Sequence, residues 1–120
     1  MAEKEVIHSE LAPAAVGPYS HAIAANNLVF TSGQVAIDPK TGKVESDTIE
    51  GQTEQVMQNL HYVLAQAGVS FDRVVKTTCF PADMNAFAAF NSVSGRYFPE
   101  NPPARSCVQV ASLQMRLKVE

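Results

Sequence analysis

The spacing of apolar residues changes from strand-like to helical near Thr48, and this change constrains the fold more than any other feature of the chain. Beyond it, apolar residues recur every three or four positions, as they do along one stripe of a helix. These residues are Val56, Leu60, Val63, Leu64 and Ala67. Asp47 and Glu50 resemble a capping box, and Gly68 stands where a C-terminal cap belongs. The sequence therefore predicts a helix over residues 49–67.

Before this helix the chain has the pattern of short strands separated by turns. Residues 4–8, 21–25 and 28–32 are β-prone runs, and the last two are joined by Asn26 and Asn27. Asparagine tolerates the positive φ of a tight hairpin turn, so we expect a hairpin there. Residues 38–42 combine a proline, which fixes φ, with a glycine in the left-handed position. A second reversal is expected at that point.

After the helix the sequence predicts three strands and a second helix. Residues 73–80 form a β-branched run that Pro81 ends. Asp83 is expected to cap a helix with Phe87, Phe90 and Tyr97 on one side. Residues 105–112 alternate as a strand does, and a last strand over residues 117–120 follows a turn.

This order, β-β-β-α-β-α-β-β, predicts an α+β fold with a mixed β-sheet and two helices on one face. A chain of 120 residues with 46% hydrophobic content is expected to form a single domain over residues 1–120. Only 18% of its residues are charged, below the usual quarter or so. We therefore expect a symmetric oligomer to cover the other sheet face, with a modestly polar exposed face as the alternative.

Charge and composition exclude several classes of function. A net charge of −3 gives no basic footprint for nucleic acid or anionic lipid. The charged N-terminus leads into no apolar segment, and the uncharged stretch over residues 11–37 is interrupted by proline, glycine and asparagine. We expect no membrane span and a cytoplasmic location. Dinucleotide, NTP and zincin motifs are absent, so these interpretations lose their usual support, and the scattered histidines and cysteines predict no zinc site.

Arg105 is the first candidate for a functional residue, because it begins an otherwise apolar strand. Such a position is unusual for arginine unless it has an anionic partner or reaches solvent. If a turn of two or four residues follows Ser112, Gln109 lies opposite Glu120 and Cys107 lies diagonal to it, on the face of Arg105. That arrangement leaves space for a small carboxylate-bearing molecule. A structural ion pair between Arg105 and Glu120 is the alternative interpretation.

Residues 103–111, Pro-Ala-Arg-Ser-Cys-Val-Gln-Val-Ala, and residues 117–120, Leu-Lys-Val-Glu, resemble the C-terminal signature of the reactive intermediate deaminase family, RidA type. Further matches follow the family's order at residues 12–19, 31–34, 38–42, 75–78, 84–85 and 90–91. The resemblance therefore covers nearly the whole chain. It departs from the family at Gln109, where glutamate is typical, and in the turn at residues 113–116.

The resemblance implies a chorismate-mutase-like fold assembled as a homotrimer with clefts between subunits. It also implies hydrolysis of 2-imino acids such as 2-iminobutanoate and 2-iminopropanoate, or their enamine tautomers, to 2-keto acids and ammonia without cofactor or metal. By matched position, Arg105 binds the substrate carboxylate and Glu120 handles the water and the leaving nitrogen. The residues implied to line the cleft are Tyr19, Ser32, Gly33, Asn91 and Cys107.

Plainer interpretations accompany these assignments. Tyr19 can pack over a turn, Ser32 and Gly33 can be ordinary strand-end residues, and Cys107 is expected to line the cleft rather than act as a nucleophile. Two rival functions also stay open. One is cleavage of single-stranded RNA, against which the acidic charge balance argues. The other is a non-catalytic trimer that binds small carboxylates.

Overall fold

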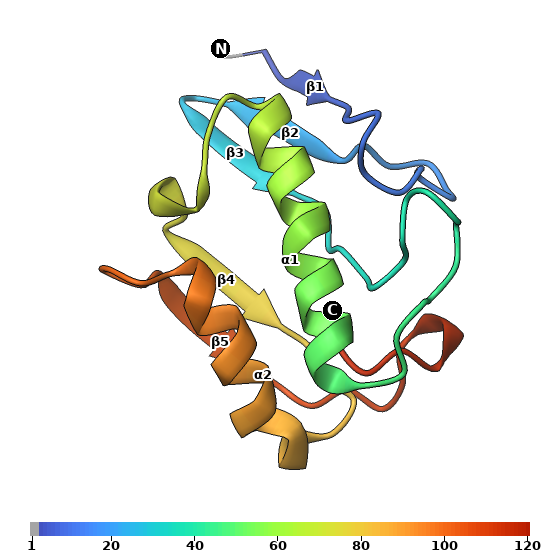
Figure 1. The fold of residues 1–120 in the computed structure, drawn as a ribbon. Helices are drawn as coiled ribbons and strands as arrows, with labels where there is room; N and C mark the ends of the chain where they lie inside the picture. The colour runs from blue at the N-terminus through green and yellow to red at the C-terminus, as the bar shows by residue number, and fades with distance from the viewer. Residues whose placement is uncertain (1–2) are drawn as a thin grey trace.

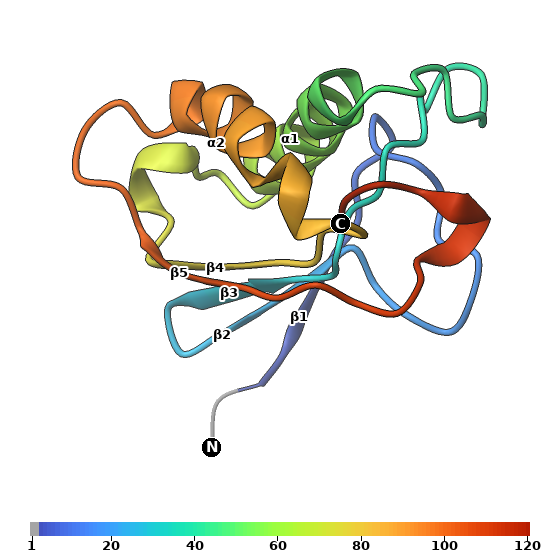
Figure 2. The ribbon, with the colours of Figure 1, turned by 90° about the horizontal axis from the view of Figure 1, so that it is seen from below.

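Two helices lie on the same side of a layer of short strands in the computed structural model, which describes residues 3–120 (Figure 1, Figure 2). The predicted α+β class, with both helices on one face, is confirmed. The elements in chain order are β1 (Glu5–Ile7), β2 (Ala22–Ala25), β3 (Leu28–Thr31), α1 (Ile49–Gln66), β4 (Lys76–Cys79), α2 (Phe87–Ser94) and β5 (Ala104–Cys107). Among the described residues, no helix is long and apolar enough to cross a membrane.

The strands form two small sheets instead of the single mixed sheet that the sequence predicted. Strands β1, β2 and β3 form an antiparallel sheet, whereas β4 and β5 form a parallel pair. The segment after β3 is hydrogen-bonded to α1. The buried Asn59 of α1 donates from its side-chain amide to the carbonyls of Val35 and Ile37, both at 2.9 Å. Those carbonyls are thereby satisfied without a neighbouring strand.

Both predicted reversals are confirmed by the backbone. Asn26 and Asn27, between β2 and β3, have φ values of 50° and 64°. These positive values match the twist of a two-residue hairpin turn. Gly42 has a φ of 72° and lies beside the bridge between Asp38 and Lys43. Short-range turn chemistry was therefore sufficient to place this half of the fold.

The helix ends differ in detail from the prediction. Helix α1 is capped by Thr48, whose hydroxyl accepts the Gly51 N–H at 3.0 Å, so the predicted capping box at Asp47 is wrong. Asp83 caps a single 3-10 turn that leads into α2, not α2 itself. Gly68, with a φ of 79°, ends α1 as expected.

The C-terminal segment lies one strand away from its predicted place. Glu120 exchanges two backbone hydrogen bonds with Phe80, at 3.0 and 3.2 Å, so it lies beside the continuation of β4 and not opposite Gln109. Gln109 instead accepts the N–H of Met84 at 2.8 Å. The strands predicted over residues 105–112 and 117–120 are shorter or absent. Strand β5 ends at Cys107, and residues 117–120 are not a regular strand.

The connection to this segment explains the difference. Met115 and Arg116 have φ values of 56° and 54°, in a turn that carries the chain across to the other edge of β4. A tight hairpin would have kept the segment beside β5. The main core beneath the helices therefore includes residues of this last segment as well as the segment that follows β3. Its buried members are Val35, Ala36, Val56, Cys79, Phe90, Leu117 and Val119.

Candidate active site

The guanidinium of Arg105 is held against α2 by two neutral side chains. Its Nη1 donates to the Asn91 Oδ1 at 2.6 Å, and its Cζ lies 5.0 Å from the centre of the Phe87 ring. The hydrogen bond and the cation–π contact fix the planar group without neutralising it. Within residues 3–120 the ion pair found is between His8 and Glu10, so the predicted alternative of a structural Arg105–Glu120 ion pair is wrong.

Phe87 was missed as a site residue when the sequence was interpreted. Its place on an apolar helical stripe indicated a core residue, yet its half-buried ring lies beneath Arg105. One available signal was its spacing from Asn91. Residues four apart on a helix share a face, so a ring and an amide at that spacing can hold one cation together.

Glu120 is half-buried, and its side chain fills the space beside Gly33. A Cβ atom on Gly33 would lie 3.2 Å from the Glu120 Cδ and would meet its Oε2 more closely still. Gly33 does not have a positive φ. Glycine is therefore required here because the carboxylate needs the space, and not because of backbone conformation.

Ser32 and Tyr19 lie in the chain segments next to Gly33. The Ser32 hydroxyl donates to the Ser20 carbonyl at 2.6 Å, and its N–H donates to the His21 carbonyl at 2.9 Å. Tyr19 follows a tight turn and remains 47% exposed. The Ser32 hydroxyl thus joins the loop before β2 to the end of β3, while the phenol of Tyr19 is open to other molecules.

A single chain arranges the predicted site residues in two groups, on either side of β4 and its continuation. Arg105 and Cys107 belong to β5 on one edge, whereas Glu120 pairs with the other edge. Neighbouring strands lie about 4.8 Å apart, so the backbones of Cys107 and Glu120 are separated by roughly 10 Å. The predicted convergence of Arg105, Cys107 and Glu120 on adjacent strands is therefore wrong in register.

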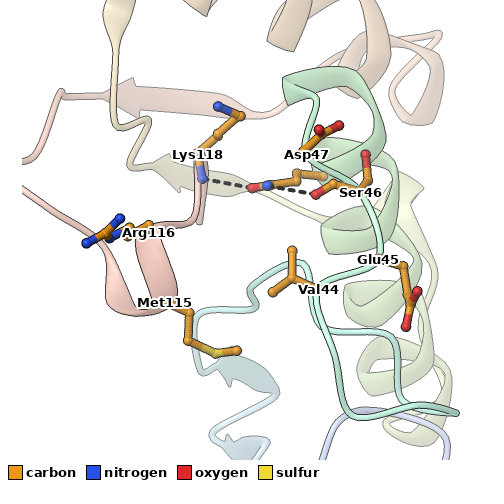
Figure 3. A pocket seen from close by; sticks show the side chains of 8 residues that line it. Val44, Glu45, Ser46, Asp47, Met115, Arg116 and Lys118 are labelled. Carbon is orange, nitrogen blue, oxygen red and sulfur yellow. Dashed lines mark hydrogen bonds between the residues drawn. The ribbon is translucent and has the colours of Figure 1, made fainter.

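Gln52 holds the segment that carries Glu120, and the sequence interpretation missed it. This buried side chain accepts the Lys118 N–H at 2.8 Å and donates to the Ser46 carbonyl at 2.9 Å, as the dashed lines in Figure 3 show. The signal was a polar residue four positions before Val56 on the apolar stripe of α1. The first bond fixes the backbone two residues before Glu120, and the second ties Gln52 to the segment that precedes α1.

A hollow of about 490 Å³ lies between residues 44–47 and 115–118. Figure 3 shows the side chains that line it. None of the predicted site residues lines it. Among residues 3–120, no three histidine, cysteine or acidic side chains gather so as to hold a metal ion.

Comparison with known proteins identifies the family. The model of the family described as endoribonuclease L-PSP matches residues 9–120. The chain belongs to this family. Among L-PSP relatives, the chloroplastic Reactive Intermediate Deaminase A of Arabidopsis thaliana is 49% identical over 98% of this chain. The chain spans 63% of that relative's length. The family resemblance found in the sequence is thereby confirmed.

Solved structures of L-PSP relatives have the same fold. A protein of Entamoeba histolytica, 48% identical, superimposes with a TM-score of 0.94 over 98% of this chain and 94% of its own. Escherichia coli TdcF with bound serine is 36% identical, with a TM-score of 0.90 over 96% of this chain and 92% of its own. A relative of this fold thus binds a small amino acid.

Proposed function

We propose that this protein hydrolyses reactive 2-imino acids, such as 2-iminobutanoate and 2-iminopropanoate, to 2-keto acids and ammonia. The observation that carries the proposal is the Arg105 guanidinium, which Phe87 and Asn91 hold in place and no acidic side chain of residues 3–120 neutralises. The name of the Arabidopsis relative supports the reaction class, and the serine bound to TdcF supports the size of the ligand. A cytoplasmic location and the absence of a cofactor belong to the same proposal.

Arg105 is proposed to bind the substrate carboxylate. A guanidinium has five N–H donors in one plane, and Asn91 accepts from Nη1. The remaining donors include a pair that matches the two oxygens of a carboxylate. Such a two-point contact fixes the C2 carbon of the substrate. The entropy cost of orienting the reactants is then met when the substrate binds and not during the reaction.

Glu120 is proposed to move the protons. Its carboxylate accepts a proton from water as the water oxygen bonds to C2 of the protonated imine, which gives a carbinolamine. Glu120 then returns the proton to the nitrogen, the C–N bond breaks with its electron pair going to nitrogen, and ammonia leaves. The hydroxyl proton is lost as the keto group forms. One positioned carboxylate can serve as base and then as acid in this sequence.

The proposed assembly is a homotrimer whose intersubunit clefts bring the two groups of site residues together. The register of β1–β3 places Val6, Ile23 and Phe30 side by side, while Ile7 and Ala22 on the opposite face are buried. Val6 and Phe30 are each 60% exposed. The chain exposes 7733 Å², against about 6,300 Å² for a monomeric protein of its mass. The exposed apolar side chains of Val6 and Phe30 and the large total surface support coverage by further copies.

The direct test is hydrolysis of freshly generated 2-iminobutanoate by the purified protein. We expect ammonia to be released faster than in the protein-free reaction, with 2-ketobutyrate formed in equal amount. An unchanged rate together with 2-ketobutyrate binding would instead identify a non-catalytic carboxylate-binding trimer. An unchanged rate without such binding would contradict both functions.

Cleavage of single-stranded RNA is the second candidate, because the family description names an endoribonuclease. The net charge of −3 argues against it, since RNA binding relies on neutralising phosphates. RNA cleavage that survives repeated purification and disappears in Arg105→Ala would favour this candidate. Cleavage that purification removes would exclude it.

Gly33→Ala is expected to lower kcat for the imine about 10- to 100-fold, because the new methyl group displaces the Glu120 carboxylate. The matched control is Gly95→Ala, whose Cβ would meet no atom within 4 Å. Steady-state rates of both variants provide the measurement. Equal rates for the two variants would show that the position of the carboxylate beside Gly33 does not matter.

A further inference from the structure

The two cysteines of the chain face each other across the parallel pair of β4 and β5. Cys79 and Cys107 are register partners, and both are free thiols. Partner residues on neighbouring strands share a face, and these strands lie about 4.8 Å apart. That spacing falls within the range of about 4.4–6.8 Å found between the Cα atoms of disulfide-bonded cysteines. Cys107 also packs against the core cluster that contains Cys79.

We propose that Cys79 and Cys107 form a redox-active pair that closes to an intramolecular disulfide when the protein meets a peroxide. The half-buried Cys107 reacts first: its thiolate bonds to one peroxide oxygen, the O–O bond breaks, and a sulfenic acid forms. The Cys79 thiolate then attacks the Cys107 sulfur and expels hydroxide. For hydrogen peroxide, the thiols lose two electrons and two protons, and the peroxide becomes two molecules of water.

The surroundings of the two thiols assign these roles. Cys107 is half-buried and lies two residues from Arg105 on the same side of β5. Cys79 is only 7% exposed and belongs to the core, which suits the second step. Burial, followed by the neighbouring Cys107, raises the pKa of the Cys79 thiol above its ordinary value of 9.0. Closure is therefore expected to accelerate as the pH rises, because the second step requires the Cys79 thiolate and burial raises the pKa of that thiol.

Closure of the pair has a consequence at Arg105, and this part of the inference rests on the proposed function. Arg105 pairs with Thr77 in the same ladder, two positions before the cysteines. Among the described residues, β5 bonds to β4 alone, so a disulfide can shift it. Such a shift changes the 2.6 Å contact of Arg105 with Asn91 and its stacking on Phe87. Carboxylate binding is expected to weaken.

The disulfide itself is tested by mass spectrometry of the full chain after treatment with hydrogen peroxide and alkylation of free thiols. The expected product is lighter than the reduced protein by two hydrogen atoms, carries no alkyl group, and reverts with dithiothreitol. In the control Cys79→Val, Cys107 is expected to gain oxygen atoms or to be alkylated. Oxygen addition at Cys107 in the unmodified sequence, without closure, would overturn the proposal.

The consequence at Arg105 is tested by titrating 2-ketobutyrate into reduced and oxidised protein. We expect the oxidised protein to bind at least about fivefold more weakly, with full recovery after reduction. Equal affinities in a chain shown to be closed would overturn the coupling to Arg105. Failure of the reduced protein to bind 2-ketobutyrate would contradict the proposed function, while the mass measurement would still decide the disulfide.

Discussion

Arg105→Ala is expected to lower kcat/KM for 2-iminobutanoate about 10³-fold, because two charge-assisted hydrogen bonds of about 1.5–3 kcal/mol each are lost. Arg105→Lys keeps the charge but loses the two-point fork and the stacking on Phe87. We expect that variant to lose about 10- to 100-fold. Steady-state kinetics on freshly generated imine measure both effects.

The matched control for Arg105 is Arg96→Ala, since Arg96 is also exposed and lies on the turn after α2. This variant removes the same charge from the protein. Comparing the two variants therefore distinguishes the loss of the local Arg105 contact from the change in net charge. We expect its kcat/KM to stay within about twofold of the parent, as exposed residues away from the site usually allow. A similar loss in Arg96→Ala and Arg105→Ala would mean that only net charge matters.

The second large effect is expected at Glu120. Glu120→Gln preserves the size of the side chain beside Gly33 but removes the group that accepts and returns the proton. We expect kcat to fall about 10²- to 10⁴-fold while 2-ketobutyrate affinity changes little. The exposed Glu100 offers the control Glu100→Gln, which should leave kcat unchanged. Near-normal rates in both Arg105→Ala and Glu120→Gln would end the deaminase proposal.

Local chemistry made much of this fold predictable. The asparagine pair between β2 and β3 and the apolar stripe of α1 act over a few residues, so the sequence alone located the hairpin and the long helix. The register of the last segment could not be predicted in this way, because it depends on the number of residues in the preceding turn. Met115 and Arg116 adopt positive φ there, which residues of their type rarely do.

The candidate site was predictable in part for the same reason. Arg105 was conspicuous because a charged residue began an apolar strand. The residues that position the site could not be recognised in the sequence, because Phe87 and Gln52 act through contacts with distant segments. Gly33 was assigned to the cleft by resemblance alone, and its contact with Glu120 supplies a physical reason for glycine at this position.

The most direct measurement of the central claim is a crystal structure of the protein with 2-ketobutyrate. We expect the ligand's carboxylate on the Arg105 guanidinium, in a groove between two subunits, with a Glu120 side chain directed at the keto carbon. An Arg105 paired with an acidic side chain of another copy, with the keto acid bound elsewhere, would contradict the account.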